Sequence, residues 1–476
     1  MANINRRGFL SSGAALGMLG GSGVLGLMAN QRAFASDVSG YKALVCIFFK
    51  GGMDHADVVL PYDDASLKQL RDKRKNLHSI YDSTNTPRTR SNLRQLNAIN
   101  ANSFGGRQFA LPPEMPEAQA LFNAGDLSIV GGVGPLVEPT TRTAMMNKTA
   151  ILPDRLFSHN DQQSTWMSLR TEGAREGWGG KFASRAYASS PNDSSQFMAI
   201  TTSSTDVFLA SETVPQFRMD KDGVPDLAAI AQQSRLGRSQ AHDSARAKFL
   251  AHLKGQNLQS NNLYLRDMIA AGGGTLDNSD QMRTALATAK TITTPFPSND
   301  LADQLAVVAQ TIAIQEALNV RRQVFYVTFG GFDMHSGQAA VMPGRLSAIS
   351  SALAAFREAL AEIGMWENVT TFTASDFGRT VIDNGDGTDH GWGAHHLIMG
   401  GAVKGGHIYG EMADYDTEGE RYTKSRGRLI PAVSVEQYAG TLGSWFGMDT
   451  GELRSALPNL GNFDNQNLGF FKTQNS

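Results

Sequence analysis

Aspartate and histidine side chains gather in one stretch of this sequence, between residues 369 and 401. Five of them could bind a metal or move protons: Asp376, Asp389, His390, His395 and His396. The stretch opens with an apolar segment at 369–373, which predicts a buried strand. Oxygen and imidazole donors directly after such a strand are typical of a metal or acid/base site at the carboxyl edge of a sheet. Asp-Gly sequences are also common in turns, so ordinary turn chemistry stays open here.

Two other expected strands, at 43–49 and 324–329, each lead into a glycine pair followed within two residues by an aspartate. These aspartates are Asp54 and Asp333. In a parallel sheet the carboxyl ends of the strands lie at one edge, where ligands bind. We therefore expect Asp54, Asp333 and Asp376 to converge there.

The spacing of Asp333 and His335 has its own meaning. In an extended segment, residues i and i+2 point to the same side, so this carboxylate and imidazole could hold one ion together. Hard oxygen donors with imidazoles and without thiolates suit zinc, manganese, magnesium or calcium, as one or two ions. The alternative is that Asp333 accepts hydrogen bonds within the turn while His335 packs.

A polar run at 157–166 is a second concentration of reactive side chains. Ser158 could be a nucleophile or ligand, with His159 or Asp161 beside it. Equally, Ser158 could cap a helix whose dipole Asp161 complements. The segment 139–143, in which threonines stand beside Arg142, is a rival source of a nucleophile.

The first 35 residues have the pattern of an export signal. Arg6 and Arg7 precede a run rich in glycine, alanine and leucine, and Ala33 and Ala35 form a small-x-small cleavage site. This pattern predicts a twin-arginine signal peptide, so the twin-arginine translocase is an expected partner. We expect a mature chain of residues 36–476 in the periplasm, outside the cell or at its surface. Glycines interrupt the apolar run, which argues against an uncleaved membrane anchor, and no membrane span is expected beyond the leader.

Composition excludes several classes of function. Without the three arginines of the leader, 40 basic and 45 acidic side chains remain, a net charge of −5, which argues against a nucleic-acid partner. Cys46 is the single cysteine. Iron–sulfur clusters and thiolate zinc sites are therefore excluded. No Gly-x-Gly-x-x-Gly fingerprint follows the first strand, which argues against an exported redox enzyme.

Short apolar segments alternate with helical periods along the chain. The expected strands are 43–49, 127–133, 197–201, 324–329 and 369–373. Apolar residues recur every three or four positions at 303–321 and 346–363. This alternation predicts one α/β domain with a mainly parallel sheet and helices on both faces. The region 138–300 has one convincing strand and predicts an inserted, largely helical cap.

The leader is followed, in order, by VCIFFKGGMDHADVVLPYDD, LFSHNDQQSTW, VTFGGFDMHSGQ, TASDFGRTVIDNGDGTDHG and MGGAVKGGHIYG. Together these segments resemble the DUF1501 family over essentially the whole mature chain. That family is placed in the alkaline phosphatase-like superfamily of sulfatases and phosphatases. The resemblance implies a mixed α/β fold with two divalent metals between the strand ends and a Ser, Thr or modified Cys nucleophile.

The resemblance also implies roles for particular residues. Asp54 matches the aspartate after the first strand, and Asp376 matches the aspartate of a late Asp-His motif. The last histidine ligand would be His390, His395 or His396. The sequence departs from the superfamily in two places, because Asp-x-x-x-His is shortened to Asp333-x-His335 and Phe377 replaces the histidine after Asp376. Asp389 and His390 could supply the missing pair, and Cys46 is wrongly placed for a formylglycine.

The function that these features predict is an exported, metal-dependent hydrolase of phosphate or sulfate esters. Its substrate would be an anionic small molecule or polymer, whose charge the metals and Arg379 or Arg142 would neutralise. His390 or His395 could protonate the leaving group. Phe377 and the unassigned nucleophile favour an alternative, a non-catalytic periplasmic or surface protein that uses the fold for binding or assembly.

Overall fold

A buried apolar strand lies at the centre of the main sheet. In the computed structural model, which describes residues 40–189, 195–225 and 263–473, strand β1 (Lys42–Lys50) is buried at seven consecutive positions. Such a run is expected where helices cover both faces of a parallel sheet. The expected leader at 1–35 lies outside the described residues.

Within the described residues, a nine-stranded sheet forms the middle layer. Its order is β13-β5-β12-β9-β1-β8-β6-β7, and β14 also pairs with β5. The strands besides β1 are β5 (Leu127–Gly134), β6 (Ala199–Thr201), β7 (Gln216–Arg218), β8 (Arg322–Gly330), β9 (Val369–Ser375), β12 (Ala394–Met399), β13 (Ile408–Gly410) and β14 (Val433–Ser434). Among them β12 is antiparallel to both of its neighbours, and the other pairs are parallel. The predicted fold class, α/β with a mainly parallel sheet, is confirmed.

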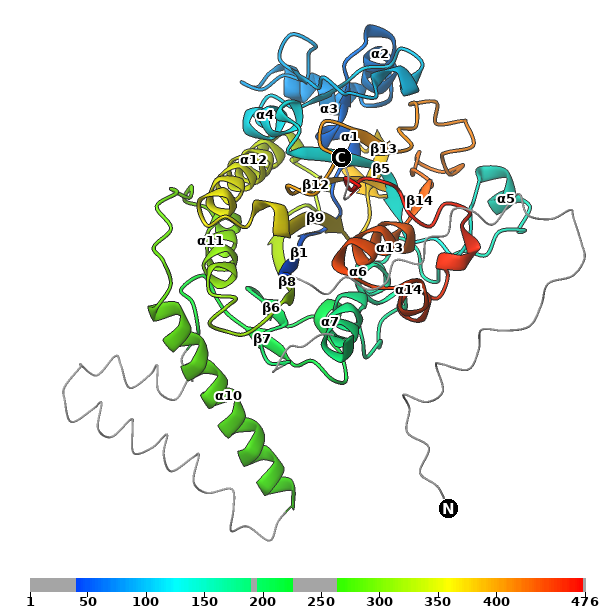
Figure 1. The fold of residues 1–476 in the computed structure, drawn as a ribbon. Coiled ribbons are helices and arrows are strands. Elements are labelled where there is room, and N and C mark those ends of the chain that lie inside the picture. Colours follow the sequence, from blue (N-terminus) through cyan, green and yellow to red (C-terminus); the bar gives the residue numbers. More distant parts are fainter. Residues whose placement is uncertain (1–39, 190–194, 226–262, 474–476) are drawn as a thin grey trace, which may run out of the picture. The chain divides into compact units, whose positions relative to one another are not determined.

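Helices cover both faces of this sheet (Figure 1). One layer contains α4 (Pro116–Ala124), α11 (Asp300–Ala313) and α12 (Gln338–Glu362). The other contains α6 (His159–Ser168), α7 (Trp178–Ser189) and α13 (Val435–Phe446). The helices expected at 303–321 and 346–363 overlap α11 and α12, but α11 ends at Ala313 and α12 begins already at Gln338. Among the described helices, α12 has the length and apolar composition that a membrane span requires, and it packs on α11 and α4 as a core helix does.

The register of the three central strands decides where the site forms. Lys50 at the end of β1 pairs with Gly330 of β8, and Phe49 pairs with Ser375 of β9. All three strands therefore end at nearly the same level. The loops that follow them, at 51–54, 331–336 and 376–378, start side by side.

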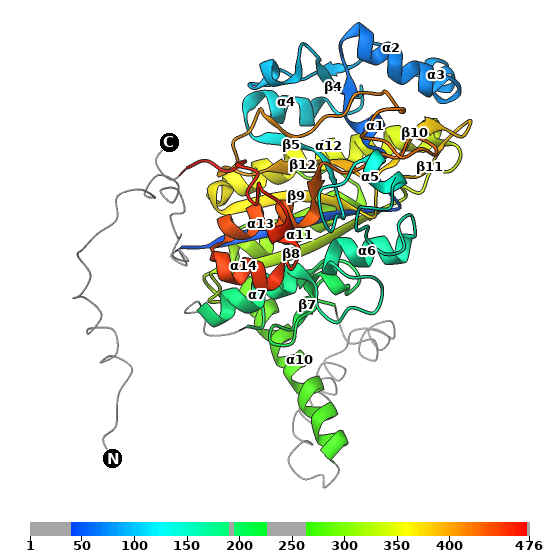
Figure 2. The same cartoon turned by 90° about the vertical axis from the view of Figure 1, so that its right-hand side faces the viewer.

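The region 138–300, in which an inserted helical cap was expected, contributes strands and helices to the main fold where it is described. It supplies β6 and β7 to the sheet and α6 and α7 to a helical layer. It also contains α5 (Arg142–Met146), the 3-10 turn η2 (Val207–Leu209) and α10 (Leu263–Ala287), which projects from the body (Figures 1 and 2).

Smaller elements complete the described fold, and the β10–β11 hairpin lies beside the ends of the central strands (Figure 2). A three-stranded sheet is formed by β2 (Leu60–Pro61), β4 (Phe109–Leu111) and β3 (Arg94–Gln95). Strands β10 (Arg379–Asp383) and β11 (Thr388–His390) form an antiparallel hairpin. The remaining elements are α1 (His55–Val58), α2 (Asp64–Lys73), α3 (Lys75–Asp82), α14 (Thr450–Ala456), η1 (Ala101–Phe104), η4 (Trp366–Asn368) and η5 (Leu460–Asn462).

Candidate metal centre

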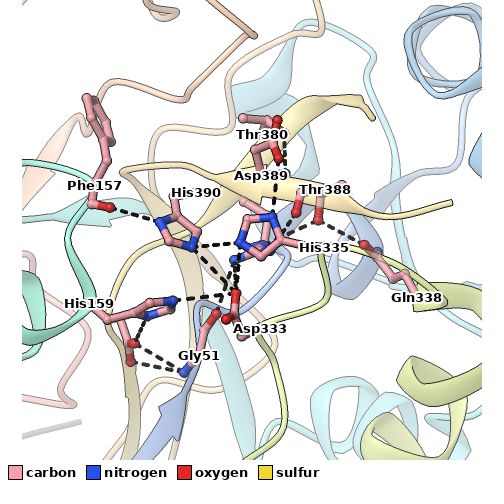
Figure 3. A network of polar contacts seen from close by, with 12 residues as sticks. Gly51, Phe157, His159, Asp333, His335, Gln338, Thr380, Thr388, Asp389 and His390 are labelled. Atoms are coloured by element: carbon pink, nitrogen blue, oxygen red, sulfur yellow. Dashed lines mark hydrogen bonds and ion pairs between the residues drawn. The ribbon is translucent and has the colours of Figure 1, made fainter. Parts of the chain in front are cut away.

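Four side chains from three segments meet at the carboxyl edge of the sheet (Figure 3). Asp333 and His335 follow β8, His390 ends β11, and His159 is the first residue of α6. The Nε2 atoms of the three histidines surround one carboxylate oxygen, Asp333 Oδ1. The distances to this oxygen are 3.4 Å from His159, 3.2 Å from His335 and 3.5 Å from His390.

The other ring nitrogen of each histidine contacts an oxygen. The contacts of Nδ1 are Asp376 Oδ2 at 2.6 Å for His159, Asp389 Oδ1 at 3.2 Å for His335 and the Phe157 carbonyl at 2.8 Å for His390. Carboxylate and carbonyl oxygens only accept hydrogen bonds, so each Nδ1 carries the hydrogen. The lone pair of each neutral ring is therefore on Nε2, which faces Asp333.

Three of these residues, His159, Asp333 and His390, fit a divalent metal ion, and His335 lies beside this set. In a tetrahedral site with bonds of about 2.0–2.2 Å, neighbouring ligand atoms lie about 3.3–3.6 Å apart, close to the separations around Asp333 Oδ1. His159 Nε2 is buried and has no hydrogen-bond partner among the described residues. The ligand atoms of His159, Asp333 and His390 all lie within 4.8 Å of one another.

The charge balance of the cluster also favours a cation. His335 Nε2 and His390 Nε2 are only 2.9 Å apart. Burial lowers the pKa of both histidines, and the Arg379 guanidinium lowers each further. Two neutral rings that turn lone pairs toward each other repel unless a cation lies between them. About half of the Asp333 and His335 side chains is exposed, 49% and 46%, so the centre is open to solvent on this side.

Asp376 is the buried carboxylate that contacts His159 on the side away from Asp333. Its side chain is fully buried and contacts His159, the Gln163 amide at 2.9 Å and the Gly51 backbone N–H at 3.2 Å. The hydrogen bond with Asp376 raises the pKa of His159, against the effect of burial. Asp376 is thus placed to orient His159, in the way that carboxylates orient histidine ligands in metal sites.

Arg379 fixes the position of Asp333. Its buried Nη1 lies 3.0 Å from Asp333 Oδ1 and also donates to the Gly51 carbonyl. Burial would raise the pKa of Asp333, but Arg379 and His159 lower it below its ordinary value. Gly51 is required here, because its φ is +114° and an added Cβ would lie 2.4 Å from the Asp333 backbone nitrogen. Most Arg379 donors are engaged within the protein, which favours a supporting role.

Asp54 does not join the cluster, which corrects the expected convergence. It caps α1, and both of its oxygens pair with the buried Arg74 at 2.6 and 2.8 Å. Gln338 donates to the same carboxylate at 2.6 Å. A buried carboxylate needs a partner of this kind, and Arg74 provides one only through the tertiary fold.

His395 is also placed away from the cluster, and His396 with it. Both lie in β12 and are buried. His395 Nδ1 accepts the Gly132 N–H at 3.0 Å, and its ring packs edge-on against His55 at 5.1 Å. Burial lowers the pKa of His395 well below its ordinary value and that of His396 to about 3. Of the three histidines considered for the last ligand position, His390 is the one in the cluster.

The expected nucleophile segments make other contacts. The Ser158 hydroxyl donates to Asp161 at 2.9 Å, and Asp161 pairs with Arg155 at 3.3 Å. The Ser158 backbone begins α6, but its side chain makes no capping bond. In the rival segment 139–143, Arg142 forms an ion pair with Glu418.

Four further contributors were not predicted from the sequence: Phe157, Gln163, Arg426 and Arg428. Gln163 lies one helical turn after His159, and this i, i+4 spacing was a readable signal. Arg426 pairs with Asp389. No local pattern distinguishes Phe157, Arg426 or Arg428, because their role depends on contacts across the fold.

A family described as "Protein of unknown function (DUF1501)" matches residues 41–458. No curated protein matches the sequence. The solved structures that resemble the chain include Ps i-CgsB in complex with k-i-k-neocarrahexaose, with 10% identity over 90% of this chain and 77% of that chain and a TM-score of 0.36. The lipoteichoic acid synthase LtaP from Listeria monocytogenes has 8% identity over 88% and 74%, with a TM-score of 0.31.

The PsFucS1 sulfatase from Pseudoalteromonas sp. has 10% identity over 86% of this chain and 73% of that chain, also with a TM-score of 0.31. At these identities and TM-scores, neither activity nor substrate can be transferred from those proteins to this chain.

Proposed function

This chain belongs to the DUF1501 family, and on that premise we propose that it is an exported, metal-dependent hydrolase of phosphate or sulfate esters. The observation that supports the proposal most is the convergence of three Nε2 atoms on Asp333 Oδ1 at 3.2–3.5 Å. The proposed export to the periplasm or cell surface rests on the arginine pair and cleavage pattern of residues 1–35.

The proposed ligands are His159 Nε2, His390 Nε2 and an oxygen of Asp333, and His335 Nε2 would be the fourth after moving toward His159. Imidazole and carboxylate ligands suit zinc and manganese better than calcium or magnesium. A divalent ion at this place would lower the pKa of a bound water and neutralise negative charge on an ester. Asp376 and Asp389 would orient His159 and His335, and Arg379 would hold Asp333.

The rim of the site favours an anionic substrate. Arg426 is 58% exposed and pairs with Asp389, directly before His390 in the chain. A permanent positive charge at the mouth of an open site attracts phosphate or sulfate groups from solution. The open side at Asp333 and His335 is compatible with a small molecule or with a polymer.

A non-catalytic binding or assembly protein is the second candidate. Among the hydrogen bonds of the described residues, none joins a serine or threonine hydroxyl to a side chain of the four proposed ligands. Hydrolysis would therefore need water as the nucleophile, or a rearrangement that frees a hydroxyl such as that of Ser158. Without either, the site would bind a metal and an anion without cleaving an ester.

Metal content, measured by elemental analysis of the purified folded protein, tests the proposal first. We expect about one zinc or manganese ion per chain, and a large reduction in Asp333→Ala. Asp464→Ala is the matched control, because Asp464 is exposed and takes part in none of the contacts described for the cluster. Aryl phosphates and aryl sulfates are then assayed with the loaded protein. Failure to bind any divalent ion on titration would overturn the proposal, and binding without hydrolysis of either ester would favour the second candidate.

A further inference from the structure

We propose that Phe157 and Arg428 are positioning residues that fix the tautomer and orientation of the His390 imidazole. They hold the hydrogen on Nδ1 and leave the Nε2 lone pair directed at Asp333. The use of that lone pair as a metal ligand rests on the proposed function, but the positioning itself does not.

The contact between His390 and Phe157 is made by the backbone. The Phe157 carbonyl lies 2.8 Å from His390 Nδ1. A carbonyl oxygen has no hydrogen to donate, so the bond forms only if Nδ1 carries the hydrogen. In metal sites such outer contacts set ring orientation and the basicity of the coordinating nitrogen.

The backbone of Phe157 adopts an unusual conformation to make this contact. Its φ is +74°, in the left-handed region that bulky residues rarely occupy. Arg155, two residues earlier, is also left-handed, with φ +51°. Such conformations persist only where surrounding contacts impose them, and they gather at functional sites.

Arg428 makes one of the contacts that hold Phe157 in this conformation. Its guanidinium carbon lies 4.2 Å from the centre of the Phe157 ring, within the range of a cation–π interaction. Its Nε donates to the His390 carbonyl at 2.8 Å. Arg428 therefore ties Phe157 and His390 together. The Phe157 ring also packs against a buried cluster that contains Trp392 and Ile430.

Arg428 is itself held by a tight hairpin at 421–430. Tyr422 bridges to Leu429, and the Thr423 N–H donates to the Arg428 carbonyl at 3.0 Å. Gly427 turns the chain with φ +61°. Arg426, at the tip, pairs with Asp389, which contacts His335 Nδ1. One hairpin thus supports two of the proposed ligands.

The tautomer of His390 can be measured directly in the metal-free protein. Long-range ¹H–¹⁵N correlation spectra of histidine-labelled protein distinguish a hydrogen on Nδ1 from one on Nε2. The His390 signals are assigned by their loss in His390→Gln. We expect Nδ1–H in the wild type and a mixture of both tautomers in Arg428→Gln and in Phe157→Ala.

Two further variants separate positioning from a general effect on folding. Phe157→Tyr keeps an aromatic ring under Arg428 and should keep Nδ1–H. Lys424→Gln removes a charge from an exposed position of the same hairpin and should also keep it. If Phe157→Ala does not fold, Arg428→Gln decides the matter alone. Retention of pure Nδ1–H in a folded Arg428→Gln protein would overturn the proposal.

Metal titration then connects the tautomer to the proposed centre. Loss of an outer support typically weakens metal binding by about 10–100-fold, so we expect this change in Arg428→Gln and none in Lys424→Gln. If no variant, including the wild type, binds a metal, the proposed function fails while the tautomer result still stands. If Arg428→Gln mixes the tautomers but binds metal as tightly as the wild type, the link between positioning and binding is refuted.

Discussion

Two groups of three histidines differ in their surroundings, which makes them chemically different. The open group contains His159, His335 and His390. The core group contains His55, His395 and His396. In the open group every Nδ1 contacts an oxygen acceptor and every Nε2 faces a carboxylate. In the core group no carboxylate accepts from a ring, and both nitrogens of His55 lack partners among the described residues.

This difference shows that histidine density alone does not make a metal centre. Burial without an acidic partner holds a histidine neutral and leaves it as a packing residue. His396 illustrates this, because its ring packs against Trp166 and Tyr438 and its Nδ1 contacts the Thr373 hydroxyl at 3.2 Å. A ligand histidine almost always donates its other ring N–H to an outer acceptor, and a carboxylate beside the free nitrogen can supply a further ligand. In the described part of the chain, the open group has both features.

Asp54→Ala should give the largest effect, and on stability rather than on metal binding. The substitution leaves the Arg74 guanidinium buried without its carboxylate, which costs about 3–5 kcal/mol of unfolding free energy. Denaturant unfolding measures the loss. Metal stoichiometry of the remaining folded protein should equal that of the wild type, and a loss of metal from folded Asp54→Ala would show that Asp54 is a ligand after all.

Acid should destabilise the protein through the core group. Burial lowers the pKa of His55 from 6.5 to about 4. Between these values the unfolded chain binds a proton that the folded protein does not, so the unfolding free energy falls as pH drops from 6.5 to 4. The full contribution is about 3 kcal/mol, present above pH 6.5 and lost below pH 4.

His55→Leu tests this origin of the acid sensitivity. The variant removes an unpartnered polar ring and should show a shallower dependence of unfolding free energy on pH, without a loss of stability at pH 7. Unfolding curves between pH 4 and 7.5 give the comparison. An unchanged slope would mean that His55 is hydrated or paired in solution.

The two groups should respond oppositely to the same substitution. His390→Ala should weaken metal binding by at least about 100-fold, because removal of a ligand exceeds the effect of removing its outer support. His395→Ala should leave the affinity within a few-fold of the wild type while lowering the unfolding temperature. Competition titration with a metal indicator, beside thermal unfolding, measures both. Equal losses of metal affinity in the two variants would contradict the assignment of the open group as metal ligands and the core group as packing residues.

Arg426→Gln should give the smallest effect. It removes the partner of Asp389, which orients His335, so we expect about a tenfold weaker metal affinity. Stability should change little, because Arg426 is exposed and surface ion pairs contribute at most about 1 kcal/mol. Lys424→Gln in the same hairpin is the control. Undiminished affinity would mean that Asp389 orients His335 without help.

The sequence by itself determined the layered fold and the edge at which reactive side chains collect. Each of the five expected strands overlaps a strand of the central sheet, because buried parallel strands require long apolar runs that are visible locally. The approach of Asp333, His335 and Asp376 followed from the same rule, since parallel neighbours end at one edge. The loop 388–390 was likewise identifiable from its unusual density of aspartate and histidine.

Only the tertiary structure decided which of these groups face one another. Asp54 and Asp333 follow similar glycine pairs, but Asp54 is buried against Arg74, whereas Asp333 pairs with Arg379 and stays about half exposed. His390 and His395 are five residues apart, and their difference lies in what covers them. A carboxylate or an imidazole responds to the charges and acceptors within a few ångströms, and those come from distant parts of the chain. For that reason the roles of Phe157, Arg426 and Arg428 could not be predicted from the local sequence pattern.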